Sequence, residues 1–232
     1  MISEEEWDLA SRITKEDFIN KFKATVLDWV KNKEAEIQEV LDKKKYSVDC
    51  KSFEASIKKR NQLEKAINDS RRKNNGAVNL KTLDEICKWG FKRDFPLRDE
   101  ERAKQITKEA FEYVDKGDYF EAVLKLMTAI KGVSISRASK IVGLSDQNKL
   151  CIYDSRVGHA LRDMKKRGIK LVKCPPDRSY KRDFDNASYR DWAMNYERLI
   201  WIIEILREYF KTKNFTLRAA DIEIALYVIG KN

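Results

Sequence analysis

The sequence predicts an all-α fold, and three observations support that fold class. Glycine and proline are sparse, with eight Gly and three Pro in 232 residues, whereas an all-β fold needs many turns. Apolar side chains recur at helical spacing, beginning with Phe18, Phe22 and Val26. Residues 199–210 are mostly apolar or aromatic, which predicts a central buried helix.

The first third of the chain predicts helices that end at one clear turn. Residues 3–6 (Ser-Glu-Glu-Glu) form a capping-box pattern. Thr14 begins a similar pattern, and the apolar stripe after it extends to Leu41. Residues 51–73 are polar with a thin apolar stripe, and Asn-Asn-Gly at 74–76 predicts a turn.

The middle of the chain predicts short helices separated by breaks. Leu80, Leu83, Ile86 and Trp89 define an amphipathic helix that ends near Gly90, before Pro96. The expected elements that follow are a helix at 99–115, a turn at 116–118, a helix at 119–130 and a helix from about Ser136.

The last third predicts helices around a basic loop. We expect a loop at 144–153, a helix from about Ser155 to Arg167, a loop at 168–186, and a last helix that Thr216 caps and Gly230 ends. We divide the chain into N-terminal helices (1–75) that pack with the C-terminal ones, a helical unit at 76–150, and a C-terminal unit at 151–232.

Composition excludes several classes of site. The chain has one histidine, His159, and four scattered cysteines without a Cys-x-x-Cys pair, so we expect neither a metal centre nor a cofactor. Free thiols are typical of a reducing cytoplasm, which is the location we expect. No apolar run reaches the roughly 18 residues of a membrane span.

The positive charge is concentrated in one segment. The formal net charge is +10, and residues 124–186 hold 15 Lys and Arg against six Asp and Glu. A local basic field of this kind favours an anionic partner such as nucleic acid.

The same segment contains a pattern of helix, glycine turn and helix at 124–142. Lys131, Gly132 and Val133 form the turn, and Ser134, Ser136 and Arg137 begin the second helix. The free amides at such a helix start, together with hydroxyl and cationic side chains, bind phosphates without reading base sequence.

This pattern resembles the helix-hairpin-helix motif of the DNA glycosylase superfamily that carries that motif. The sequel Ile-Tyr-Asp-Ser-Arg-Val at 152–157 resembles the segment that bears the family's essential carboxylate, and the resemblance assigns that role to Asp154. Asp154 is also a good helix N-cap. The family pattern usually has Gly at the position of Ser134.

The resemblance also predicts the type of chemistry. Family members that cleave the strand carry a lysine in the hairpin, where this chain has Ser136, and a serine cannot form an imine. We therefore expect a monofunctional enzyme that hydrolyses the N-glycosidic bond. We expect Lys140, one turn further on, to face solvent.

Aromatic and basic residues alternate just before the hairpin and could line a base pocket. The candidates are Trp89, Phe91 and Arg93, with Tyr153 beside Asp154. A flipped base needs such surfaces to replace its lost stacking. Ordinary core packing is the alternative for Trp89 and Tyr153. His159 lies on the helix that Asp154 opens and has no visible acid–base partner.

The leading hypothesis is a monomeric DNA glycosylase acting on double-stranded DNA that contains a damaged or modified base. Some family members act on modified bases of foreign DNA, so the resemblance also allows a role against phage, although no residue favours it. The residues do not identify the base. The alternatives are a non-enzymatic DNA-binding protein and a basic helical module that binds protein or RNA.

Overall fold

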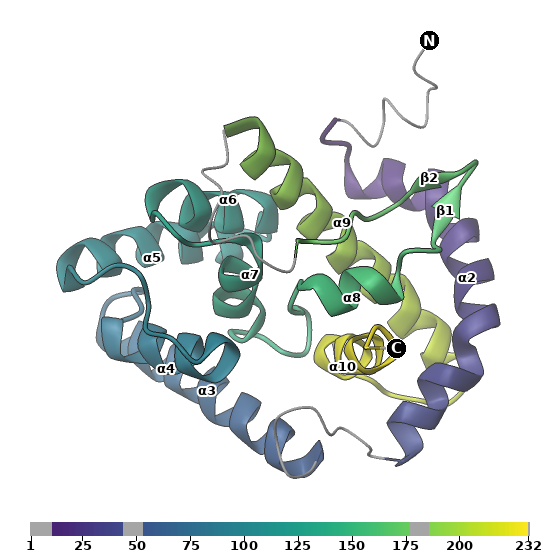
Figure 1. Ribbon diagram of the computed structural model, residues 1–232, viewed down its shortest axis with the longest axis horizontal. Coiled ribbons are helices and arrows are strands. Elements are labelled where there is room, and N and C mark those ends of the chain that lie inside the picture. Colours follow the sequence, from purple (N-terminus) through teal and green to yellow (C-terminus); the bar gives the residue numbers. More distant parts are fainter. Residues whose placement is uncertain (1–10, 44–52, 177–185, 232) are drawn as a thin grey trace.

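The computed structural model describes residues 11–43, 53–176 and 186–231, and these segments are mostly helical (Figure 1). The helices are α2 (Lys15–Lys43), α3 (Phe53–Lys73), α4 (Leu80–Phe91), α5 (Glu100–Asp115), α6 (Tyr119–Ala129), α7 (Ile135–Gly143), α8 (Ser155–Ala160), α9 (Asn186–Lys211) and α10 (Ala219–Ile229). Strands β1 (Lys165–Lys166) and β2 (Ile169–Lys170) form a small antiparallel hairpin. The expected all-α class is therefore confirmed. The capping box at 3–6 lies outside the described residues.

The apolar helix α9 joins two groups of helices. It packs against α6 and α7 on one side and against α2 and α10 on the other. In Figure 1, α3 to α7 lie together, and α2, α8, α10 and the β-hairpin lie opposite them. The N-terminal helix α2 thus packs with the C-terminal helices, while α3 contacts α4.

Side-chain caps fix where several helices begin. Asn79, Asp99 and Asp118 each accept a hydrogen bond from a backbone N–H three residues ahead, which satisfies an amide that the helix leaves free. The Thr14 hydroxyl likewise accepts from the Asp17 N–H at 3.1 Å. These starts agree with the sequence-based expectations.

Two sequence-based boundaries were wrong. The helix that Asp154 opens ends at Ala160 and not near Arg167, because the chain leaves it through tight turns in which the Arg162 N–H donates to the His159 carbonyl and the Met164 N–H to the Leu161 carbonyl. Arg167 and Gly168 then form the turn of the β-hairpin, with positive φ angles of 51° and 86°. The last helix is capped at Arg218 and not at Thr216, because the Asp221 carboxylate accepts from the Arg218 N–H at 2.9 Å. Gly230 ends that helix as expected.

None of the described helices is long and apolar enough to cross a membrane. Across the same residues, no group of three or more His, Cys, Asp or Glu side chains is arranged to hold a metal ion.

Candidate active site

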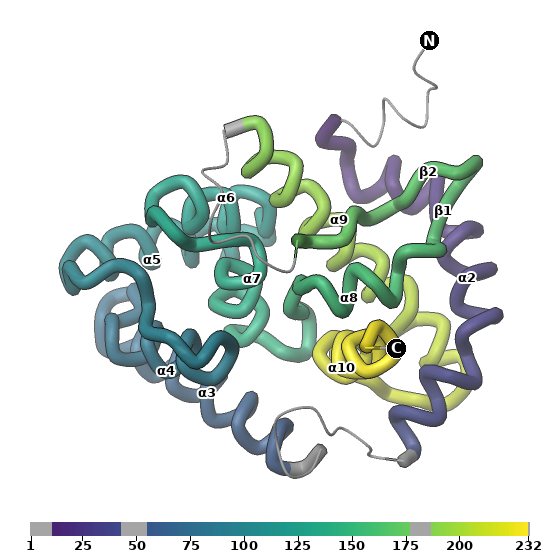
Figure 2. Tube along the Cα trace, in the orientation of Figure 1, coloured from purple at the N-terminus to yellow at the C-terminus, as the bar shows by residue number. Residues whose placement is uncertain are grey.

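The turn between α6 and α7 is closed by one glycine in a left-handed conformation. Gly132 has a φ of +86°, which favours glycine, and the Val133 N–H donates to the Ile130 carbonyl at 3.1 Å. Figure 2 traces the chain from α6 through this turn into α7. Ser134 has an extended backbone with a φ of −87°, so a serine fits this position without strain.

The residues expected to bind phosphate do not all face solvent. Lys131 and Gly132 are exposed, Ser134 and Ser136 are partly exposed, and Val133 is buried. Arg137 is also buried: its guanidinium donates to the Gly132 carbonyl and lies over the Phe91 ring. Arg137 therefore holds the turn against α4.

Asp154 caps α8, as the structural alternative for this residue predicted. Its Oδ1 accepts from the Val157 N–H at 3.2 Å, and its side chain is 17% exposed. The chain before it is fixed to α7 by Ser139, whose hydroxyl donates to the Tyr153 carbonyl at 3.2 Å and accepts from the Tyr153 N–H at 3.0 Å. The hairpin's second helix thus positions the Asp154 carboxylate.

The expectation that Lys140 faces solvent was wrong. Its side chain is 8% exposed, and its Nζ lies 3.8 Å from Asp154 Oδ2. The Nζ also lies 4.7 Å from the centroid of the Phe91 ring. The side-chain stem runs over Gly90, where an added Cβ would come within 2.7 Å of the Lys140 Cδ and Cε. An amine therefore lies directly beside the candidate carboxylate.

Burial is the main influence on the Lys140 amine. Removal from water disfavours the ammonium form, so the pKa of Lys140 is lowered. The charges of Asp154 and Glu223 oppose this lowering of the pKa, while that of Arg60 adds to it.

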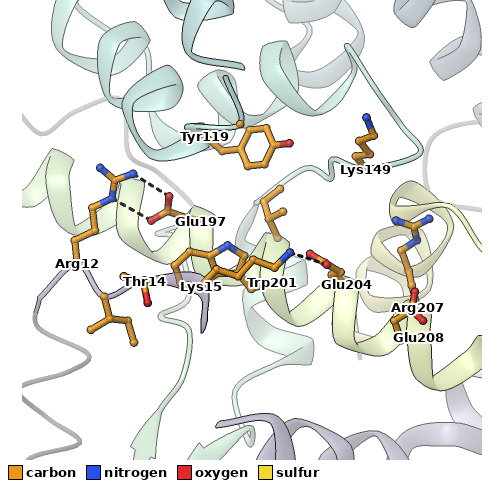
Figure 3. Close-up of a pocket in the computed structure, with 13 residues that line it drawn as sticks. Arg12, Thr14, Lys15, Tyr119, Lys149, Glu197, Trp201, Glu204, Arg207 and Glu208 are labelled. Carbon is orange, nitrogen blue, oxygen red and sulfur yellow. Dashed lines mark hydrogen bonds and ion pairs between the residues drawn. The ribbon is translucent and has the colours of Figure 1, made fainter. Parts of the chain in front are cut away.

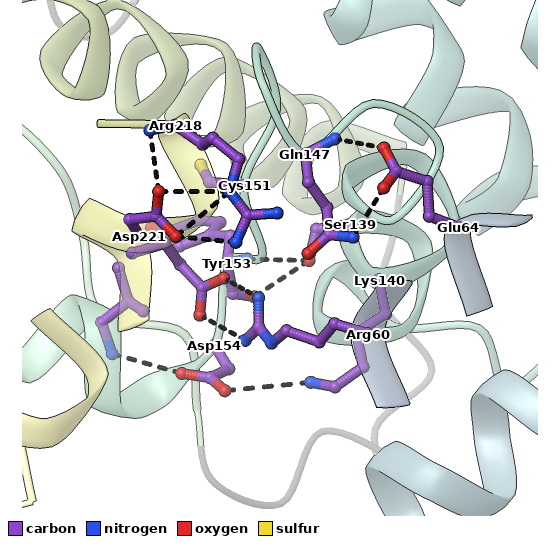
Figure 4. Close-up of polar contacts among 12 residues, drawn as sticks. Arg60, Glu64, Ser139, Lys140, Gln147, Cys151, Tyr153, Asp154, Arg218 and Asp221 are labelled. Carbon is purple, nitrogen blue, oxygen red and sulfur yellow. Dashed lines mark hydrogen bonds and ion pairs between the residues drawn. The ribbon is translucent and has the colours of Figure 1, made fainter. Parts of the chain in front are cut away.

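A second buried ion pair lies next to the first (Figure 4). Arg60 of α3 donates from Nη1 and Nη2 to the two carboxylate oxygens of Glu223 of α10, at 2.6 and 3.0 Å. The exposed fractions of Arg60 and Glu223 are 3% and 0%. Burial raises the pKa of Glu223, while the Arg60 charge opposes that rise. We call Arg60, Glu223, Lys140 and Asp154 the charge quartet.

The quartet was not predicted from the sequence, although one local signal existed. Glu223 stands in a run of apolar residues from Ile222 to Ala225, and a charge inside such a run indicates a buried partner. The spacing of 163 residues between Arg60 and Glu223 gave no comparable signal.

The four candidates for the base pocket separate into two groups. Trp89 and Phe91 are partly buried at the end of α4 and lie beside the quartet, because Arg60 is 5.5 Å from the Trp89 ring centroid and Lys140 lies over Phe91. Arg93 is exposed. Tyr153 is fully buried, and its hydroxyl donates to the Lys173 carbonyl, so its ring packs in the core and does not face a base.

Neighbouring residues on α8 do not complete an acid–base pair. His159 is exposed, and Arg156 donates to the Tyr227 hydroxyl at 2.6 Å and stacks on its ring.

The structure also contains a cavity of about 750 Å³ near the start of α2 (Figure 3). Two of its cationic side chains are paired within the protein: Arg12 with Glu197 and Asp118, and Lys15 with Glu204. A second cavity of about 710 Å³ lies between α3 and the 145–150 loop. Neither cavity is lined by a quartet residue.

Comparison with known proteins adds no assignment. No family model, no curated protein and no solved structure matches the chain.

Proposed function

We propose that the protein is a DNA glycosylase that removes a damaged or modified base from double-stranded DNA. The observation that carries this proposal is the position of Asp154, a partly exposed carboxylate held against the second helix of a phosphate-binding type of hairpin. The basic charge of 124–186 supports a DNA partner.

The chemistry requires that a positive charge on the sugar be stabilised. The target base leaves the stack, at a cost of a few kcal/mol, and its N-glycosidic bond breaks with the electron pair passing to the base. Asp154 stabilises the developing sugar cation and orients a water molecule. The water oxygen bonds to C1′ and its proton is passed to the departing base, which leaves an abasic site.

The test is a panel of duplexes with oxidised, alkylated, mismatched and hypermodified bases, treated with the protein and then with alkali. We expect release from at least one duplex, and its loss in Asp154→Asn with DNA binding retained. The matched control is Asp99→Asn, since Asp99 also caps a helix through its carboxylate, but the helix it caps is α5. If no duplex loses a base, the enzyme hypothesis fails; salt-insensitive binding would exclude the non-enzymatic DNA-binding alternative as well.

A second candidate activity is cleavage of the strand, and the position of Lys140 favours it. The expectation of hydrolysis alone rested on Ser136 and on a solvent-facing Lys140, but the amine lies 3.8 Å from Asp154. A desolvated lysine is a suitable nucleophile toward an aldehyde. The open form of an abasic sugar presents an aldehyde at C1′.

The steps of this activity balance without a cofactor. The neutral Lys140 amine adds to C1′, one proton taken up from solvent allows the carbonyl oxygen to leave as water, and an iminium forms. Transfer of the C2′ proton to water then expels the 3′ phosphate with its bonding electron pair and returns the proton taken up before. Water finally hydrolyses the conjugated imine and returns the amine.

Borohydride reduction on abasic duplex separates the two activities. A covalent adduct in the native protein that disappears in Lys140→Met, but persists in the exposed control Lys149→Met, would establish the lysine chemistry. Absence of the adduct in the native protein would leave hydrolysis alone.

A further inference from the structure

The β1–β2 hairpin was not foreseen from the sequence and belongs to neither the charge quartet nor the helical hairpin. Residues 162–173 contain six basic residues and one acidic residue, Asp163. The turn residues Arg167 and Gly168 and the strand residues Lys165 and Lys170 are all exposed. The hairpin therefore presents a strongly basic tip.

The hairpin contacts α2 through one of its lysines. Lys166 Nζ donates to the Lys21 carbonyl at 3.0 Å and lies 5.2 Å from the Phe22 ring centroid. Beyond the strand pair, the Leu171 N–H donates to the Met164 carbonyl at 3.1 Å, and both side chains are buried. One lysine of the hairpin thus anchors it, while the others point outward.

The two outward lysines repel each other in the folded chain. Lys165 and Lys170 are directly opposite in the antiparallel register, where like charges destabilise a strand pair. Neither makes an ion pair with any residue in the described segments. A polyanion lying across the strands would neutralise both charges at once.

We propose that the β1–β2 hairpin is a second surface for the phosphate backbone of double-stranded DNA. The exposed positions of the tip are cationic or glycine, which fits phosphate contacts, whereas an interfacial membrane anchor carries large apolar side chains. The surface follows the Asp154 helix along the chain and adds exposed basic residues to Lys131 of the α6–α7 turn. This inference goes beyond the glycosidic chemistry and needs only DNA binding.

The experiment measures binding to an unmodified duplex over a range of salt concentrations, with Lys165→Gln/Lys170→Gln against the native protein. Each lost phosphate contact reduces the slope of log affinity against log salt by about 0.9, so the slope should fall by about 1.8. If the variant and the native protein bind with equal affinity at 1 M salt, a slope lower by 1.8 corresponds to roughly a 30-fold lower affinity of the variant at 0.15 M. Thermal stability should stay equal or rise, because the repulsion is removed.

Two further variants make the result decisive. Lys165→Arg/Lys170→Arg keeps the charge and should retain the native slope. Lys31→Gln/Lys211→Gln removes the same charge from exposed positions elsewhere and should reduce the slope much less. An unchanged slope in the hairpin variant, or an equal reduction in the control, overturns the proposal; so does binding of the native protein to anionic vesicles or acidic protein but not to DNA.

The outcomes are separable from those of the proposed enzyme. A reduced slope without base release from any duplex supports the surface and refutes the glycosylase. Base release with an unchanged slope supports the glycosylase and refutes the second DNA-binding surface.

Discussion

Replacing Asp154 with asparagine should lower the free energy of unfolding, because the buried Lys140 amine then lacks the carboxylate beside it. Asparagine keeps the cap on α8 because its side-chain oxygen can still accept from the Val157 N–H. The carboxylate charge next to Lys140 is lost. At 3.8 Å the gross attraction is about 4 kcal/mol at an effective dielectric constant of 20. Asp154 is partly exposed, and Glu223 remains near the amine, so we expect a net destabilisation of about 2 kcal/mol.

The pH dependence of this loss identifies its origin. Burial places the pKa of Lys140 in the folded chain below its ordinary value, which is about 10.4. At a pH between the folded and the unfolded pKa of Lys140, the unfolded chain binds one more proton than the folded chain, so the free energy of unfolding rises with pH. Removing the Asp154 charge lowers the folded pKa of Lys140 further and widens this range toward neutral pH. The deficit of Asp154→Asn should therefore be largest near neutral pH and shrink as the pH approaches 10.

The assay is urea unfolding of the native protein and of Asp154→Asn between pH 6 and pH 10. Adding Lys140→Met to Asp154→Asn removes the titrating amine and should recover most of the lost free energy of unfolding. A deficit that is independent of pH, or a double variant no more stable than Asp154→Asn, would refute the reasoning, because the loss would then come from the cap or from packing.

Three other changes follow from the packing around the site. Gly143→Ala should destabilise the chain by about 3 kcal/mol, because the new Cβ would overlap the Cys151 carbonyl in the backbone; a normal midpoint in urea would contradict this. Glu223→Gln should cost about 3–5 kcal/mol, since it leaves the Arg60 charge buried without its carboxylate, and calorimetry measures the loss. Tyr153→Phe should cost about 1 kcal/mol and leave the rate of base release unchanged, because the ring faces the core; a large fall in rate with normal stability would return Tyr153 to the base pocket.

Most of the helical structure was predictable because its signals are local. The asparagine and aspartate caps, the turn at 74–76 and the apolar face of α9 each act within a few residues. The β-hairpin was missed because its strands are only two residues long and carry no alternation of polar and apolar side chains. Its one signal was the Arg167-Gly168 dipeptide, which fits a two-residue turn with positive φ.

The Asp154 carboxylate of the candidate site could be predicted from the sequence, but the buried charges around it could not. Asp154 follows from a short motif, whereas the surroundings of Lys140 depend on elements distant in sequence. Most of α7 around Lys140 is covered, as the burial of Arg137, Ser139 and Ile141 shows. A lysine on a helix ordinarily faces solvent, and the helical period of α7 alone does not reveal that α4 covers this one.

The two candidate activities, base release and strand cleavage, both require Lys140 in its neutral form. A protonated amine 3.8 Å from Asp154 would cancel part of the negative charge that a sugar cation needs, and a protonated amine cannot attack an aldehyde. Both reactions therefore proceed best from the neutral amine, which burial of Lys140 favours and the charges of Asp154 and Glu223 disfavour. Binding of DNA phosphates favours the charged form instead, since anions raise the pKa of a nearby lysine. Lys140 is buried whereas Lys131 of the α6–α7 turn is exposed, so a phosphate that binds at this turn would contact Lys131 and not the Lys140 amine.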